Sequence, residues 1–130
     1  MIRALRPTLS AIATTILALT IAGFALAQEQ AGFFSNMDDL PVMPGLTEVV
    51  EAGMVFDSSA GRIVEAFATG RVAEAEIIRF YAETLPQLGW APSSRTTYSR
   101  DGEVLTLELQ PPPAAGQPLG VRFSLSPAGP

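Results

Sequence analysis

The sequence predicts one small α+β domain, an antiparallel sheet of four to five strands with one helix packed on one face. Three observations support this fold class. One segment has apolar residues at helical spacing, several short segments have strand composition, and an Asp-Gly pair separates two of these strands. No segment repeats. Strands before and after a single helix are typical of an α+β layer pair.

The first part of the domain is expected to form short strands. Residues 36–46 contain two Pro and a Gly, which exclude a long helix and predict a turn at Pro44-Gly45. Strands are predicted at Thr47–Val50, Met54–Asp57 and Arg62–Thr69. In the third strand the small face, which suits a covering helix, is formed by Val64, Ala66 and Ala68, and the other face by Ile63, Glu65 and Phe67.

The only predicted helix is Glu74–Leu88. Apolar residues recur on one face at Ile77, Tyr81, Leu85 and Leu88. Pro86 weakens the last turn, and Gly89 is placed to end the helix. We expect Trp90 to fold back over the helix end.

The last strands are joined by the Asp101-Gly102 pair, which accepts the positive φ angles of a type I′ turn. Counting outward from this turn places Tyr98 opposite Leu105. The shared apolar face is then Tyr98, Leu105, Leu107 and Leu109. After an irregular loop at 110–119, the alternation in Gly120–Ser126 predicts a final strand with Val121, Phe123 and Leu125 inward.

The first 27 residues have the three parts of a secretory signal peptide. Arg3 and Arg6 precede an uncharged apolar stretch that ends in Ala-Leu-Ala at 25–27. We therefore expect cleavage after Ala27 and a periplasmic or secreted product; the alternative is an uncleaved membrane anchor. The predicted organisation is a signal peptide at 1–27, a flexible lead-in at 28–39, one domain at 40–126 and a tail at 127–130.

The composition excludes several functional classes. The chain has no His, Cys or Lys, so imidazole bases, thiolates, disulfides and Schiff-base lysines are excluded. After cleavage six Arg stand against 13 acidic residues, a net charge of −7, which argues against nucleic-acid binding. Residues 28–61 hold six of these acids and no base. We predict no enzymatic activity and no cofactor.

The domain resembles a group of small uncharacterised exported bacterial proteins and lipoproteins. The resemblance is carried by the Pro44-Gly45 turn, by Gly61-Arg62-Ile63-Val64 and by Phe80-Tyr81-x3-Leu85-x3-Gly89-Trp90. It covers about residues 40–126 and implies a turn, a strand, a helix and three final strands in that order. It implies no site residues, and without Cys the chain cannot be a lipoprotein.

Other candidate sites have a simpler structural interpretation. Asp38-Asp39 lacks the spacing of a calcium loop, and Asp57-Ser58-Ser59 lacks a base and predicts a turn. Glycosidase chemistry needs two carboxylates at a suitable separation, and Glu65 is the one acid expected on a sheet face. The Phe-Tyr and Gly-Trp pairs of the helix are expected to be core rather than a ligand cradle. Four arginines could recognise an anion: Arg62, Arg95, Arg100 and Arg122. Cross-strand pairing of these arginines with Glu65, Glu103 and Glu108 is the favoured interpretation.

One segment, Phe33–Met43, is a candidate for docking another protein, with another envelope protein as the expected partner. It combines apolar side chains with two acids and no base. The candidate residues are Phe33, Phe34, Asp38, Asp39, Leu40 and Met43. The favoured alternative is that the segment packs across the open sheet face near Ile63 and Phe67. The predicted function is an exported, non-enzymatic protein-binding or structural module; the alternatives are a membrane-anchored periplasmic domain and a small-ligand carrier.

We predict that the mature protein begins at Gln28, because signal peptidase cuts after small residues in the A-x-A pattern. Intact mass measurement of protein from the cell envelope should show the loss of residues 1–27. A mass that retains them would establish the anchor instead.

Overall fold

The structure is a computed structural model that describes residues 32–129. Its main sheet has seven antiparallel strands, so the expected four to five strands are too few, although the α+β class with one helix is confirmed. The two-residue strand β6 at one end of the sheet is too short to signal a strand, whereas the equally short β3 at the other end lies within the predicted segment Thr47–Val50. The predicted signal peptide, residues 28–31 and Pro130 lie outside the described residues.

The elements follow one another in a simple order. A hairpin comes first, and the helix divides the main sheet into two groups of strands. One 3-10 turn lies within the first group of strands, and the other directly follows the helix. Their bounds are β1 Phe33–Phe34, β2 Met37–Pro41, β3 Thr47–Glu48, η1 Val50–Ala52, β4 Met54–Ser58, β5 Gly61–Gly70, α1 Glu74–Thr84, η2 Leu85–Leu88, β6 Ala91–Pro92, β7 Thr97–Arg100, β8 Glu103–Gln110 and β9 Leu119–Pro127.

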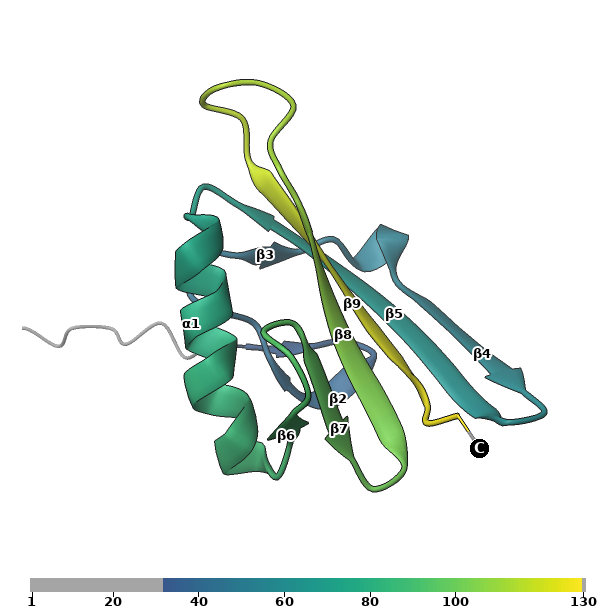
Figure 1. Cartoon of the computed structure of the whole chain (residues 1–130). Coiled ribbons are helices and arrows are strands. Elements are labelled where there is room, and N and C mark those ends of the chain that lie inside the picture. The colour runs from purple at the N-terminus through teal and green to yellow at the C-terminus, as the bar shows by residue number, and fades with distance from the viewer. Residues whose placement is uncertain (1–31, 130) are drawn as a thin grey trace, which may run out of the picture.

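Strand β5 is the longest strand and organises the sheet. The strand order is β3-β5-β9-β8-β7-β6, and β4 also pairs with β5. On one side β5 therefore pairs with β9, and on the other side with β3 and β4 in succession. Figure 1 shows the β4–β5 hairpin projecting from the side of the molecule away from α1.

The β7–β8 hairpin has the predicted register. Asp101 and Gly102 have φ angles of 49° and 78°, as a type I′ turn requires, and Tyr98 lies opposite Leu105. The face inferred from this register is the buried one, since Tyr98, Leu105 and Leu107 are all core residues.

The helix ends earlier than predicted. The α-helix stops at Thr84, and Leu85–Leu88 continue as a 3-10 turn. Pro86 has no N–H for the next helical hydrogen bond, which explains the change. Gly89, with φ 90°, ends the turn as expected, and the buried Trp90 donates its backbone N–H to the carbonyl of Leu85 (3.1 Å).

The core lies on one face of the sheet, which we call the inner face. The small side chains of β5, Val64, Ala66 and Ala68, are almost completely buried there, as predicted. Helix α1 contributes Ile77 and Tyr81 to the same cluster. No described element covers the opposite, outer face.

Residues 33–41 form an ordered hairpin where the sequence predicted a flexible lead-in to residue 39. Phe33 pairs with Pro41 and Phe34 with Met37. The segment folds onto the inner face beside α1, where the rings of Phe34 and Phe123 have centroids 4.8 Å apart. The physical reason is an apolar residue at every third position, Phe34, Met37, Leu40 and Met43, all of which are buried.

Tyr81 joins the helix to the segment that follows the hairpin. Its hydroxyl donates to the carbonyl of Pro41 (2.8 Å) and accepts from the N–H of Met43 (3.2 Å). Burial raises the pKa of Tyr81 above its usual value of 10.0, although the hydrogen bond from Met43 opposes the shift. The neutral hydroxyl thus satisfies two buried backbone groups that have left water.

We predict that Tyr81→Phe lowers the free energy of unfolding by about 1–3 kcal/mol, since both backbone groups lose their partner while the ring remains. Urea unfolding of the two proteins measures the difference. Tyr98→Phe is the control, because Tyr98 is also a buried core tyrosine. Equal stability of wild type and Tyr81→Phe would contradict this role.

Candidate functional site

The least protected part of the sheet is the edge strand β4. Among the described residues it pairs only with β5, and all five of its residues are exposed. Three of them are large and apolar: Met54, Val55 and Phe56 are 47%, 49% and 46% exposed. Because an unpaired apolar edge is a template for another strand, β4 is the candidate interaction site.

The neighbouring hydrogen bonds show which backbone groups of β4 face outward. The N–H of Val49 donates to the carbonyl of Phe67 (2.8 Å), so the odd-numbered residues of β5 present their backbone groups toward this edge. Ile63 therefore faces Phe56, its register partner. Since alternate residues of a strand point their groups to opposite sides, the N–H and C=O groups of Val55 and Asp57 point away from the sheet.

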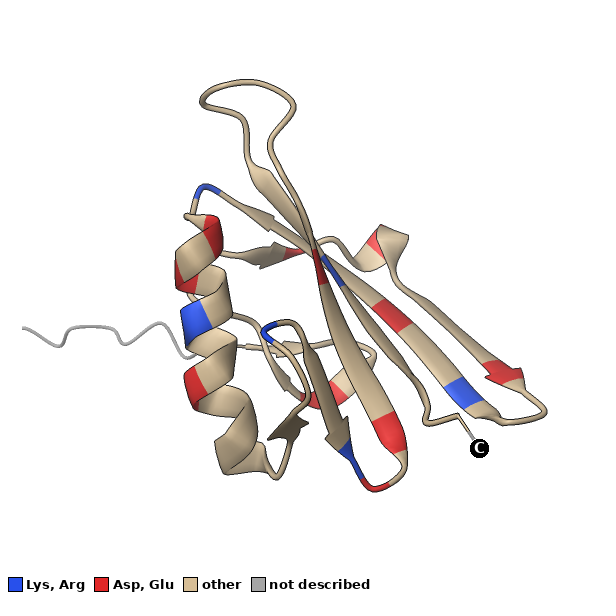
Figure 2. Cartoon of the chain, viewed as in Figure 1, with Lys and Arg blue, Asp and Glu red and all other residues tan. Residues whose placement is uncertain are grey.

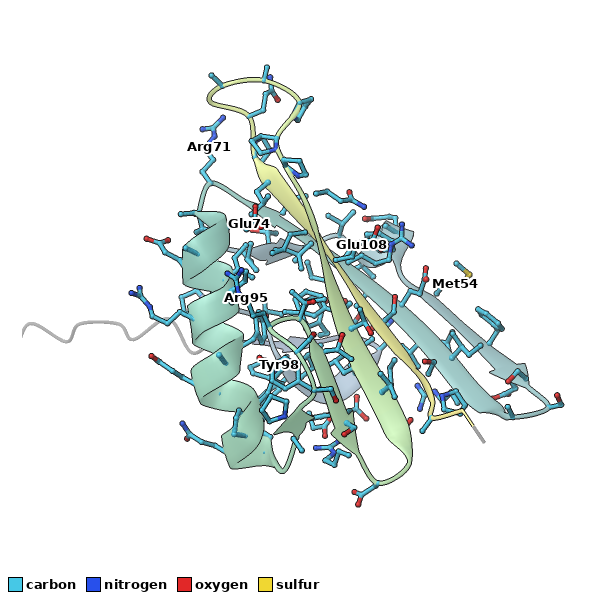
Figure 3. All side chains as sticks on the ribbon, viewed as in Figure 1. Met54, Arg71, Glu74, Arg95, Tyr98 and Glu108 are labelled. Carbon is cyan, nitrogen blue, oxygen red and sulfur yellow. The ribbon has the colours of Figure 1, made fainter. Side chains whose placement is uncertain are left out.

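The side chains of β4 divide between the two faces of the sheet. Met54 and Phe56 lie opposite Glu65 and Ile63 and share the outer face with them. Val55 lies opposite Val64 and extends the inner face beyond the core. Figure 3 shows Met54 projecting away from the ribbon at this edge.

The edge is acidic. Residues 47–60 contain Glu48, Glu51 and Asp57 and no base. Glu48 accepts hydrogen bonds from the N–H and hydroxyl of Ser35 (3.1 and 2.8 Å), so its charge is partly engaged. Arg62 lies opposite Asp57 and donates to the carbonyl of Asn36 (3.4 Å). Figure 2 shows the remaining acids on η1 and at the end of β4.

The outer face has cross-strand ion pairing at Arg122. Its guanidinium lies 3.9 Å from the carboxylate of Glu65 and 3.6 Å from that of Glu108, and it stacks over the ring of Phe67 at 5.5 Å. The four arginines considered for anion binding do not gather here. Arg100 instead pairs with Asp39, donates to the carbonyl of Leu88 (2.9 Å) and stacks on Trp90 at 4.3 Å.

Two surface pockets are lined by residues outside β4. One, of about 300 Å³, lies between the β1–β2 hairpin and the inner face, with Val64 and Leu125 among its apolar residues. Its charged lining has both signs: Asp38, Asp39 and Glu103 together with Arg62 and Arg100. The other, of about 390 Å³, lies between the start of α1 and the β8–β9 loop. Neither pocket brings a nucleophile next to a base.

The other chemical candidates have structural roles. The hydroxyl of Ser58 donates to the carbonyl of Gly61 (2.7 Å) and accepts from the N–H of Ala60 (3.3 Å), which makes Asp57-Ser58-Ser59 part of the predicted turn. Residues 32–129 contain no group of three acidic side chains placed to hold a metal ion. In the same range no helix has the length and apolarity that crossing a membrane requires.

The six predicted docking residues do not form one surface. Phe34, Leu40 and Met43 are buried in the core. Phe33, Asp38 and Asp39 are exposed, and Asp39 is paired with Arg100. The alternative expectation, that the segment packs on the sheet, agrees with the burial of Phe34, Leu40 and Met43. These side chains pack on the inner face, however, whereas the expected contacts Ile63 and Phe67 lie on the outer face.

Sequence reasoning did not single out the β4 edge. The available signal was Met54-Val55-Phe56, three apolar residues without the alternation of a half-buried strand. Such a run is equally consistent with a strand buried on both faces.

Comparison of the chain with known protein families, with curated proteins and with solved structures finds no match.

We predict opposite outcomes for two neighbouring phenylalanines. Phe34→Ala should lower the free energy of unfolding by about 3–5 kcal/mol, because a fully buried ring leaves a cavity against Phe123. Phe33→Ala should change it by less than about 0.5 kcal/mol, since Phe33 is 58% exposed. Denaturant unfolding of both variants checks this. Similar losses in the two variants would mean that the hairpin is packed in another register.

Proposed function

We propose that this chain is an exported, non-enzymatic protein-binding module that adds an extended segment of a partner to β4. The proposal places the mature protein in the periplasm or outside the cell, after cleavage behind Ala27. The observation that carries it is the exposed β4 edge, whose outward backbone groups and three apolar side chains have no partner among the described residues.

Strand addition uses both features of this edge. Outward N–H and C=O groups give a partner strand main-chain hydrogen bonds, and side chains at alternate positions select its sequence. Soluble proteins usually protect an edge with Pro, Lys, a bulge or a covering element. Strand β4 has no Pro or Lys, its register with β5 is regular, and its one charge is Asp57. An edge left in this state favours a binding role.

The chemistry of the chain supports a non-enzymatic role. Within residues 32–129 its polar clusters are ion pairs and turns, such as Arg122 with Glu65 and Glu108, rather than a reactive group beside a base. A small-ligand carrier is less well supported, because both pockets are open at the surface and the guanidinium of Arg100 beside one of them is already engaged by Asp39, Leu88 and Trp90.

A photoreactive amino acid at Met54, introduced in the organism that produces the protein, tests this function. We predict a covalent adduct of discrete mass from position 54 and none from Ala82, an exposed residue of α1. The adduct should disappear in Val55→Pro, because proline removes an outward N–H without breaking a hydrogen bond to β5.

Val55→Thr is the matched control, since it changes the side chain and keeps the N–H. It should retain the adduct, and the thermal midpoints of both variants should show that the sheet is intact. No adduct from position 54, or an adduct that persists in a folded Val55→Pro protein, would refute strand addition at β4.

A further inference from the structure

We infer that the segment received by β4 is basic, an extended chain in which Lys or Arg alternates with apolar residues. This inference rests on the proposed function and adds the chemical class of the partner. It comes from the charges along the edge and from the way β4 divides its side chains between the two faces.

Acidic residues outnumber basic ones along this edge. The strip from β3 through β4 contains Glu48, Glu51 and Asp57 without a base, and Arg62 is the one cation opposite it in the register. Arg62 also donates to the carbonyl of Asn36, which draws it toward the β1–β2 hairpin. An approaching strand therefore meets negative charge at both ends of β4, and a basic strand is steered to it.

The faces of β4 determine where the basic residues belong. A strand paired with β4 places one set of alternate side chains beside Met54 and Phe56 on the outer face, next to Ile63. This set must be apolar. The other set lies beside Val55 and Asp57 on the inner face, where a Lys or Arg stem can cover Val55 while its charge reaches Asp57.

The nearby pocket of the inner face carries charges of both signs. It includes Val64, the register partner of Val55, together with the acids Asp38, Asp39 and Glu103 and the bases Arg62 and Arg100. Arg100 is paired with Asp39. The preference for a basic segment therefore rests on the strip along β3, η1 and β4, and not on this pocket.

A second copy of the chain fits the edge less well. Pairing of two β4 strands would bring together two acidic strips from chains that each carry a net charge of −7 after cleavage, with no base in residues 47–60 of either. Like charges across a contact oppose association. A basic partner has no such repulsion.

Fluorescence anisotropy with labelled peptides of about eight residues, a usual strand length, tests the inference. The probes alternate Val with Lys, Val with Glu, and Val with Thr, so that the alternate side chains are positive, negative or uncharged. We expect the Val-Lys peptide to bind at least about tenfold more tightly than the other two, and more weakly as salt rises. Val55→Pro should lose this binding, and Val55→Thr should keep it.

A pair of charge-matched variants separates the edge from the general acidity of the chain. Glu51→Gln with Asp57→Asn should weaken binding of the Val-Lys peptide several-fold. Glu74→Gln with Glu83→Gln removes the same charge from exposed positions on α1 and should leave binding unchanged. Equal losses in the two double variants would show non-specific attraction and overturn the inference.

The remaining outcomes distinguish this inference from the proposed function. Equal binding of all three peptides that is lost in Val55→Pro overturns the basic partner and leaves strand addition in place. Light scattering that shows a dimer in wild type and a monomer in Val55→Pro overturns the basic partner and identifies a second copy of the chain as the occupant of β4. If no peptide binds while the position-54 adduct forms, the partner is not a basic strand.

Discussion

The small side chains on the inner face of β5 are the constraint on which the rest of the structure depends. Val64, Ala66 and Ala68 leave room for two covering elements on one face, helix α1 and the β1–β2 hairpin. Larger residues there would separate both covers from the sheet, since interiors are packed as closely as organic crystals. Phe123 of the adjacent strand contacts both covers, as its ring lies 4.8 Å from that of Phe34 and 5.1 Å from that of Tyr81. The hydroxyl of Tyr81 then connects helix and hairpin segment through two backbone groups.

The same arrangement explains why a candidate site exists at β4. An α-helix of 11 residues is about 16 Å long, and with the hairpin it covers less than the area of a seven-stranded sheet. The core is completed over β5, β9 and β8, while the β4–β5 hairpin projects beyond its covers. Val55, on the inner face, is thus left at the surface, and Phe56 lies on the outer face, which no described element covers. Edge exposure, apolar character and negative charge coincide at this one place, which gives the proposed partner its expected chemistry.

Much of the fold could be predicted because it follows from local geometry. The register of β7 and β8 is set by the positive φ angles that Asp101-Gly102 accepts, and the two faces of β5 follow from alternation along the strand. Little of the candidate site could be predicted. The docking segment expected at 33–43 has Phe34, Leu40 and Met43 in the core, whereas the exposed apolar edge has the composition of an ordinary strand. Hydropathy identifies side chains that need burial, but not which of two apolar segments receives it.

The sequence by itself determined the elements whose geometry a few neighbouring residues control: the type I′ hairpin, the left-handed stop at Gly89 and the buried face of β5. It also determined which chemistry is absent, since a chain without His, Cys or Lys lacks those reactive groups however it folds. Only the tertiary structure decided that Phe34 is covered and Phe56 is not. The physical reason is that burial depends on segments distant in the chain. The hairpin at 33–41 lies beside α1 over the inner face, and no described element lies over β4.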